Sequence, residues 1–372
     1  MQSADRPLLL LVGLLFLSPI LQAGIEPETI SNKTLANPEA SWFIAKATMG
    51  TSFVFNATDG SMLGTLSTNP FTPAVERHPA RAEIYAAESH YTRRTYGTRN
   101  DILTIFDHAN LAPVAEVDLP DKIGSLNFAE YISLLGDQRH LTVFNMTPAQ
   151  SVSIVDVETR KFVGELSTPG CALTMSTGER GFLMMCGDGT LQLIRLNDQG
   201  AEVSRVRSKP FFTIDKDPVF DQPVATQQGW QMVSFEGKVF EVVTDGDKIN
   251  ISKSWSLLTD ADRAEKWRVG GGQLLALHQT LDLMYALVHQ GGVDTHEDPG
   301  TEVWVFDRTS QRRIARLPLA KPTRSILITQ DEAPRLIASA ANEPTLDIYD
   351  ARKLTHQQTV QLGMVVGLLA AY

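Results

Sequence analysis

The sequence predicts an all-β fold, a seven-bladed β-propeller with four-stranded blades. Two observations carry this prediction. An apolar alternating strand, a polar turn and a second alternating strand occur together seven times, and each copy follows a further apolar strand. Period-2 alternation rich in Val, Ile, Phe and Tyr is typical of strands. The seven copies begin at Thr51, Ile102, Ser151, Thr190, Lys238, Glu302 and Thr345. Their mean spacing of about 49 residues suits a four-stranded blade.

A propeller closes on itself, so one blade must combine strands from both ends of the chain. Either the apolar tail, residues 363–372, or the segment 40–47 supplies that strand. A pair of β-sandwiches is the alternative architecture. The regular spacing of the seven copies argues against it, because sandwich strands do not recur at a constant interval.

The turns inside the repeats also follow a pattern. Five copies carry Asp or Asn at the same offset, namely Asn56, Asp107, Asp156, Asp307 and Asp350. An Asx side chain there can accept a hydrogen bond from the backbone of the turn that follows. The longest interval contains SLLTDADRAEKW, where we expect Thr259 to cap a short helix whose first turn is acidic.

The N-terminus has the features of a secretory signal peptide. Arg6 precedes an apolar stretch, residues 8–21, and the small residue Ala23 follows it. The stretch is shorter than the roughly 20 residues that span a membrane, and Pro19 interrupts it. We therefore expect residues 1–23 to be a signal peptide, residues 24–372 to form a single propeller domain, and the protein to be periplasmic. No later segment is long and apolar enough for a membrane span.

The two cysteines fit an oxidising compartment. Cys171 and Cys186 lie in two apolar stretches separated by a turn, so they can face each other across antiparallel strands. We predict a disulfide between them. Two buried free thiols are the alternative, and without a flanking His at ligand spacing the pair makes a poor zinc site.

The charge and the motifs exclude several functions. Lys and Arg total 33 against 43 Asp and Glu, a net charge of −10, which disfavours nucleic acid as a partner. The sequence has no G-x-S-x-G elbow, no phosphate loop and no H-E-x-x-H, and its eight histidines are dispersed. We predict no catalytic residue and no metal site in this chain. The acidic cluster Asp215, Asp217 and Asp221 is interpreted as a solvated loop.

Two segments are candidate partner surfaces. Arg93, Arg94 and Arg99 alternate with tyrosines in HYTRRTYGTRND, where bidentate contacts could hold a carboxylate-rich partner. The alternative is a solvated hairpin. Trp267 precedes three glycines, residues 270–272, a combination that implies close backbone approach beside a large aromatic ring. For this segment, packing between blades is the alternative.

Several long, collinear segments resemble the large (heavy) subunit of the quinoprotein amine dehydrogenases, of the methylamine and especially the aromatic amine type. The segments include RRTYGTRNDILTIFD, SIVDVETRKFVGE, the pair Cys171 and Cys186 followed by GDG, SRVRSKPFFTIDKDPVF, SWSLLTDADRAEKWRVGG, and His296 before EVWVFD. The resemblance covers most of the chain after residue 23.

The resemblance implies a function that the chain performs with partners. It implies oxidative deamination of a primary amine to an aldehyde and ammonia, in an assembly of two large and two small subunits. The tryptophan tryptophylquinone cofactor would reside on the small subunit, and electrons would pass to a cupredoxin of the azurin or amicyanin kind. The large subunit would bind no cofactor itself.

The resemblance also implies site residues. The large subunit of this family contributes an aromatic residue to the substrate channel, and Phe43 in SWFIAKATMG is the candidate here, with Trp42 and Ile44 as alternatives. Packing inside the first blade is the other interpretation of Phe43. Arg93, Arg99 and Trp267 are the candidates for the small-subunit interface. The sequence departs from the family at Tyr96, where Arg is usual, which puts the same docking charge pairs in doubt.

Two other functions compete with this one. A propeller that binds or scaffolds a partner without a quinone would share the fold and the missing active site. A hydrolase of the lactonase type would need metal or His ligands gathered at one end of the channel, and the sequence shows no such cluster.

Overall fold

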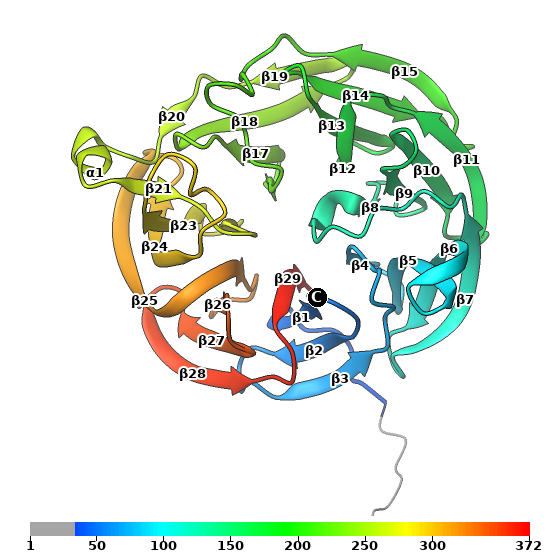
Figure 1. Ribbon diagram of the computed structural model, residues 1–372, viewed down its shortest axis with the longest axis horizontal. Helices are drawn as coiled ribbons and strands as arrows, with labels where there is room; N and C mark the ends of the chain where they lie inside the picture. The colour runs from blue at the N-terminus through cyan, green and yellow to red at the C-terminus, as the bar shows by residue number, and fades with distance from the viewer. Residues whose placement is uncertain (1–33) are drawn as a thin grey trace, which may run out of the picture. The chain divides into compact units, whose positions relative to one another are not determined.

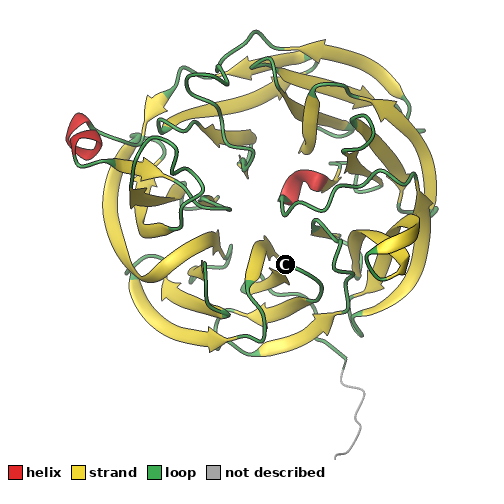
Figure 2. Cartoon of the chain, in the orientation of Figure 1, coloured by secondary structure: helices red, strands yellow, loops and turns green. Residues whose placement is uncertain are grey.

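The predicted all-β propeller is confirmed. A computed structural model describes residues 34–372, and these form one compact unit. Their sheets are arranged radially around a common centre (Figure 1), and helical structure is confined to two short segments of the described chain (Figure 2). The expected signal peptide, residues 1–23, lies outside the described residues. Among the residues described, no helix has the length and apolar character needed to cross a bilayer.

One sheet joins the two ends of the described chain. Its order is β29-β1-β2-β3, which pairs the C-terminal strand with the first strand of the propeller. The strands are β29 (Val366–Ala371), β1 (Trp42–Ala47), β2 (Ser52–Asn56) and β3 (Met62–Leu66). Phe43 pairs with Ala371, and Ala47 pairs with Val366. The apolar tail is therefore the innermost strand of the closing blade, and the segment 40–47 provides the strand beside it.

Four further sheets follow along the chain, each ordered from the inside outward. The first three are β4 (Val75–Arg77), β5 (Glu83–Arg93), β6 (Tyr96–Asp107), β7 (Ala112–Leu119); β8 (Ile132–Leu134), β9 (His140–Asn145), β10 (Ser151–Asp156), β11 (Lys161–Ser167); and β12 (Cys171–Thr177), β13 (Gly181–Cys186), β14 (Leu191–Leu196), β15 (Glu202–Arg207). The fourth is β16 (Val224–Ala225), β17 (Gly229–Val233), β18 (Lys238–Asp245) and β19 (Lys248–Ile251), with β20 (Trp255–Ser256) paired to β18. The short 3-10 helix η1 (Ala129–Tyr131) precedes β8.

The last sheet contains eight strands, because one long strand belongs to two neighbouring sets. The strands are β21 (Trp267–Val269), β22 (Leu275–His278), β23 (Leu283–Gln290), β24 (Gly300–Asp307), β25 (Arg312–Ile328), β26 (Arg335–Ala340), β27 (Thr345–Asp350) and β28 (Thr355–Gln361). The first half of β25 pairs with β24 and the second half pairs with β26. Before this sheet lies α1 (Asp260–Ala264), with Thr259 in a capping box with Asp262, as the sequence predicted.

The predicted Asx turns are present in all five copies. In each, the backbone N–H two or three residues on donates to the Asx side chain, at 2.7 to 3.0 Å. Four residues after the Asx comes a left-handed residue: Gly60, Leu111, Arg160, Gln311 or Leu354. A register shift accompanies each turn. One turn with a β-bulge thus recurs around the ring and twists each outer hairpin in the same way.

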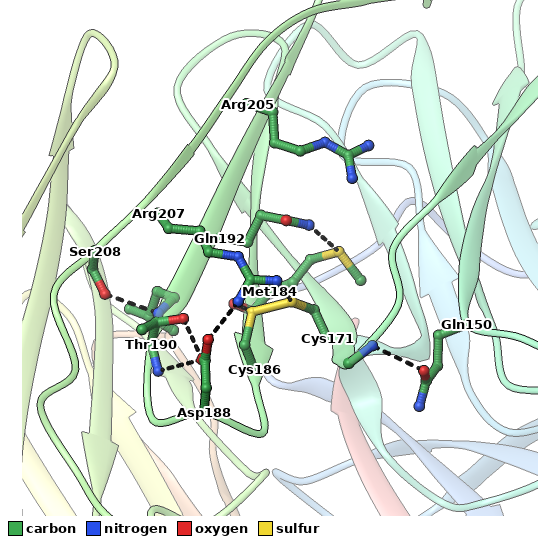
Figure 3. Close-up of a disulfide and its surroundings, with 12 residues drawn as sticks. Gln150, Cys171, Met184, Cys186, Asp188, Thr190, Gln192, Arg205, Arg207 and Ser208 are labelled. Carbon is green, nitrogen blue, oxygen red and sulfur yellow. Dashed lines mark hydrogen bonds and ion pairs between the residues drawn. A yellow bond between two sulfur atoms is a disulfide. The ribbon is translucent and has the colours of Figure 1, made fainter.

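The predicted disulfide between Cys171 and Cys186 is confirmed. The two residues face each other across β12 and β13, and the Arg207 guanidinium lies beside them, 2.7 Å from the Asp188 carboxylate (Figure 3). Replacing both cysteines by serine is expected to lower the free energy of unfolding by about 3 kcal/mol, because the cross-link restricts the unfolded chain. Urea denaturation of the variant measures this, with the unsubstituted protein under dithiothreitol as the control. An unchanged midpoint would contradict the expectation.

Candidate functional site

The antiparallel strands give the propeller two different end faces. One face, the loop face, carries the loops between the second and third strands and the connections that enter each inner strand. The other, the turn face, carries the Asx turns. The β5–β6 hairpin, which contains Arg93 and Tyr96, and the β23–β24 loop, which contains His296, both lie on the loop face.

Exposed apolar side chains gather on the loop face. Of 13 large hydrophobic residues exposed in the described chain, seven lie in loop-face segments and the other six lie on outer strands. We call these seven the apolar rim: Met49, Tyr96, Leu126, Met146, Ile214, Val293 and Met364, which are 40 to 71% exposed. They come from seven different connections around the ring. Apolar side chains that concentrate on one face mark an interaction surface.

A cavity of about 400 Å³ opens within the loop face, and we call it the mouth cavity. Its lining comes from chain segments far apart in sequence, including Thr48 after β1, Asn127 before η1 and Gly367 in β29. One wall is aromatic. The His296 ring stacks on Phe235 with centroids 4.1 Å apart, and Phe220 packs against Phe235 at 4.5 Å.

Two carboxylates and one guanidinium give the mouth cavity its polar character. Asp221, Glu297 and Arg324 all line it. Asp221 is open to the cavity, but the surrounding protein limits its solvation and raises the pKa of its carboxyl group, and the neighbouring Glu297 charge acts in the same direction. The His296 Nδ1 is buried without a hydrogen-bond partner. An aromatic wall beside acidic groups can hold a small cation or an aromatic amine.

The glycines after Trp267 support the wall of this cavity. Gly271 has φ of +119°, and its N–H donates to the His296 carbonyl at 3.1 Å. The N–H of Gly272 donates to the Arg324 carbonyl at 2.8 Å. A Cβ atom at Gly271 would lie 2.7 Å from the Leu287 side chain. The close backbone approach that the sequence implied is confirmed, and it fixes the His296 loop at the edge of the cavity.

A buried lysine anchors another part of the lining. Lys46 is 1% exposed, and its Nζ donates to Asn127 Oδ1 at 2.9 Å and to the Ala47 carbonyl at 3.1 Å. Burial lowers the pKa of Lys46 to about 8. Sequence reasoning did not find this residue, since nothing in a short alternating strand shows that a lysine points inward. Its contact with Asn127 ties the first blade to the segment before η1.

The lowered pKa of Lys46 predicts a pH dependence of stability. Below pH 8 the folded protein bears the cost of a buried charge, and this cost disappears as the pH rises towards the unfolded value of 10.5. Relative to Lys46→Met, the unsubstituted protein should therefore gain about 2–3 kcal/mol in free energy of unfolding between pH 7 and 10.5. Urea denaturation of both proteins at several pH values measures the difference. A difference independent of pH would contradict the expectation.

The predicted interface arginines occupy different environments. Arg93 is exposed at the tip of the β5–β6 hairpin, and its guanidinium lies 5.7 Å from the centroid of the Tyr96 ring. Arg99 instead turns inward, where it binds Asp101 through two hydrogen bonds and donates to the Ile123 carbonyl at 2.6 Å. The exposed Arg93 side chain can contact a partner, whereas the Arg99 side chain supports the loop face through its hydrogen bonds to Asp101 and Ile123. An interface role for either stays a prediction.

Trp267 also lies on the loop face, but most of its side chain is covered. It is 7% exposed and packs on Trp304 with centroids 5.2 Å apart, and its Nε1 donates to Glu265 at 3.1 Å. The guanidinium of Arg316 lies over the same ring. The packing interpretation accounts for this geometry, and the interface role of Trp267 stays a prediction.

Phe43 lies at the turn-face end of β1. It is fully buried and stacks on Phe55 at 5.6 Å, within a cluster that also contains Ile337 and Leu369. It is not among the residues that line the mouth cavity, whereas Thr48, just beyond the other end of β1, is. The packing interpretation fits Phe43, and its role in a substrate channel stays a prediction without support from this cavity.

The acidic cluster of the sequence separates in space. Asp217 accepts from the Glu236 N–H at 2.9 Å and from Lys238 Nζ at 2.8 Å, so it stabilises a turn. Asp221 lines the mouth cavity instead. Within residues 34–372, no group of three or more His, Cys, Asp or Glu side chains is arranged to hold a metal ion.

The fold and site define a β-propeller with an apolar end face that surrounds a cavity. The sequence model described as methylamine dehydrogenase heavy chain (MADH) matches residues 39–367. The chain belongs to this family. It is 29% identical to the methylamine dehydrogenase heavy chain of Paracoccus versutus over 322 residues, covering 84% of this chain and 73% of the relative. It is 29% identical to that of Methylophilus methylotrophus over 270 residues, covering 71% of this chain and 66% of the relative, just under two thirds.

Solved structures agree on the fold alone. A putative 6-phosphogluconolactonase from Bacteroides fragilis superposes with a TM-score of 0.59 at 10% identity, over 92% of this chain and 99% of that one. A dihydro-heme d1 dehydrogenase, NirN, superposes with a TM-score of 0.56 at 13% identity, over 92% of this chain and 77% of that one. At such low identity, a shared propeller does not transfer an activity.

Proposed function

We propose that this chain is the large subunit of a periplasmic, tryptophan tryptophylquinone-dependent amine dehydrogenase, and that the cofactor resides on a separate small subunit. The apolar rim around the mouth cavity is the observation that carries the proposal. A heavy chain implies a light chain, and the rim offers a surface on which one can bury apolar groups. The partner seated there would enclose the mouth cavity.

The proposal includes the architecture of the exported chain. We propose seven four-stranded blades, because the eight-stranded sheet divides into two sets at β25, where pairing changes from β24 to β26. Together with the five other sheets this gives seven. Cleavage after residue 23 would leave 24–372 as a single domain. The disulfide supports export, since such bonds persist in oxidising compartments.

The proposed reaction converts a primary ammonium ion and water into an aldehyde, an ammonium ion, two protons and two electrons. The small subunit's quinone would supply the electron sink. This chain's residues would bind and orient: Asp221 and Glu297 attract the cationic amine, the aromatic wall of Phe235 and His296 packs against its substituent, and the docked rim excludes water. We propose that no group of this chain takes part in bond breaking.

The wider assembly is also part of the proposal. Two large and two small subunits would form the enzyme, and a cupredoxin of the azurin or amicyanin kind would accept the electrons one at a time. A propeller that binds a partner without a quinone is the second candidate, and the rim would serve it equally well. The lactonase alternative gains no support, since the described residues offer no cluster of metal ligands.

Purification from the native periplasm tests the proposal. We expect intact mass spectrometry to find a small copurifying chain, and we expect its quinone absorbance to bleach when a primary amine is added. An amine-dependent dye-reduction assay then ranks aromatic against short aliphatic amines. A colourless, inactive protein would overturn the dehydrogenase and favour the binding protein.

A further inference from the structure

A second cavity lies deeper in the propeller, towards the turn face. It consists of two adjoining spaces of about 460 and 410 Å³. Both spaces are lined by Glu76, Ala129, Glu130, Ala225 and Trp230, so we treat them as one and call it the inner cavity. Gln222 lines both this cavity and the mouth cavity, so the two lie back to back along the channel. The residues around Gly178 and Gln228 open the inner cavity towards the turn face.

Glu130 is a buried acid with one unpartnered carboxyl oxygen. It stands in η1, is 8% exposed, and its Oε2 makes no hydrogen bond. The Leu134 backbone and the Arg77 charge stabilise the ionised form of Glu76. The charges that act on Glu130 are instead those of two other acids, Glu76 and Asp221. Burial raises the pKa of Glu130 to about 8 and that of Glu76 to about 7. A buried polar atom without a hydrogen bond is costly, and a bound ligand is one way to satisfy it.

The other charged groups nearby offset this pair only in part, through the charge of Arg77 on Glu76. Arg77 follows Glu76 in β4, but its Nη1 donates to the His78 carbonyl at 2.9 Å and its guanidinium lies over the Tyr372 ring. Asp221, on the side of the mouth cavity, adds negative charge and raises the pKa of Glu130 further. In the empty cavity burial favours the protonated form of both carboxyl groups, whereas a bound cation would favour the ionised form and gain one or two counter-charges in a poorly solvated place.

Trp230 distinguishes between kinds of cation. Its indole lines both halves of the inner cavity, and its Nε1 donates to the Ser176 carbonyl at 2.9 Å, which fixes the orientation of the ring. Aromatic faces attract organic ammonium ions, whereas Ca²⁺ needs six or more oxygen ligands and Mg²⁺ needs octahedral geometry. The described residues provide no such cluster.

We propose that the inner cavity binds a small organic ammonium ion, with Glu130 and Glu76 as counter-charges and Trp230 as the aromatic wall. This site lies on the opposite side of the channel from the apolar rim, so it stays accessible when a partner covers the loop face. It is separate from the proposed dehydrogenase reaction and does not depend on it.

Tetramethylammonium chloride is the probe, because a quaternary ammonium cannot be deaminated and reports binding alone. We expect isothermal titration of the mature protein, with any partner it retains, to show saturable binding relative to sodium chloride at equal ionic strength. Glu130→Gln should weaken this binding at least tenfold. Trp230→Phe should remove the accompanying change in tryptophan fluorescence. Glu179→Gln is the matched control, since Glu179 is an exposed turn-face acid outside the cavity lining, and it should bind as the unsubstituted protein does.

Several outcomes would overturn the site. These are no saturable binding, equal affinity in Glu130→Gln, and displacement of the probe by Ca²⁺ at lower concentration, which would indicate a metal site. The raised pKa keeps the Glu130 carboxyl mostly protonated near neutral pH, and Glu130→Gln replaces it by a neutral amide of the same shape, so we expect a melting temperature no lower than that of the unsubstituted protein. Glu76→Gln provides a second test should that variant not fold. An inactive enzyme that still binds the probe would overturn the dehydrogenase and leave this site standing.

Discussion

Val293→Glu is expected to weaken association with the small subunit by about 100-fold. Val293 is 71% exposed in the β23–β24 loop, next to the His296 segment of the mouth cavity. A partner that seats on the rim would bury this side chain, and a carboxylate there would lose its hydration without gaining a counter-charge. A penalty of about 2.7 kcal/mol corresponds to that factor. The substitution lies on an exposed loop, so the fold itself should be unaffected.

Val203 provides the matched control for this experiment. It is 61% exposed but lies on β15, an outer strand far from the loop face, and Val203→Glu should leave association unchanged. Copurification of tagged variants with the small subunit gives a first comparison, and surface plasmon resonance gives the ratio of dissociation constants. If both variants associate equally well, the rim is not the docking surface. If Val203→Glu alone fails, the partner binds the outer wall instead.

The sequence predicted the outer part of each blade well, because that part is locally encoded. Alternating strands and an Asx residue such as Asp156 lie next to each other in the chain, and the turn hydrogen bond forms between neighbours. The inner strands were harder to find. β4, β8 and β16 have only two or three residues, and such short strands leave no alternation to detect.

The candidate sites could not be predicted for a different reason. Asp221 and His296 line the same cavity only because the propeller ring places their two connections side by side. The residues are far apart in the sequence, so no local spacing could predict that they come together. Glu130 looks like a polar residue in a loop until η1 places it inside the channel. Trp267 and Arg99 were proposed as interface residues because of their side-chain types. Contacts with residues distant in sequence decide how much of each side chain is exposed to a partner.

Asp101→Ala is expected to destabilise the protein by about 3 kcal/mol, because it leaves the partly buried guanidinium of Arg99 without its counter-charge. Asp101 is fully buried. Its carboxylate accepts from Arg99 Nε at 2.7 Å and Nη2 at 2.6 Å, and from the Ile123 N–H at 2.8 Å. Removing it takes away one acceptor from the guanidinium and one from the Ile123 backbone donor, which is buried. Urea denaturation measures the loss.

The same network connects the interior to the apolar rim. Arg99 and Asp101 belong to β6, near Tyr96, and Ile123 begins the segment that carries Leu126. Asp101→Asn retains the shape and one acceptor oxygen, so we expect it to lose less stability than the alanine variant. Glu158→Ala is the control, because its ion pairs with Arg81 and Arg139 are long and exposed and should be worth under about 1 kcal/mol. If Asp101→Ala and Glu158→Ala lose the same free energy of unfolding, the Arg99–Asp101 pair does not hold the apolar rim in place. If Asp101→Ala loses much more and also binds the small subunit more weakly, the pair does hold it.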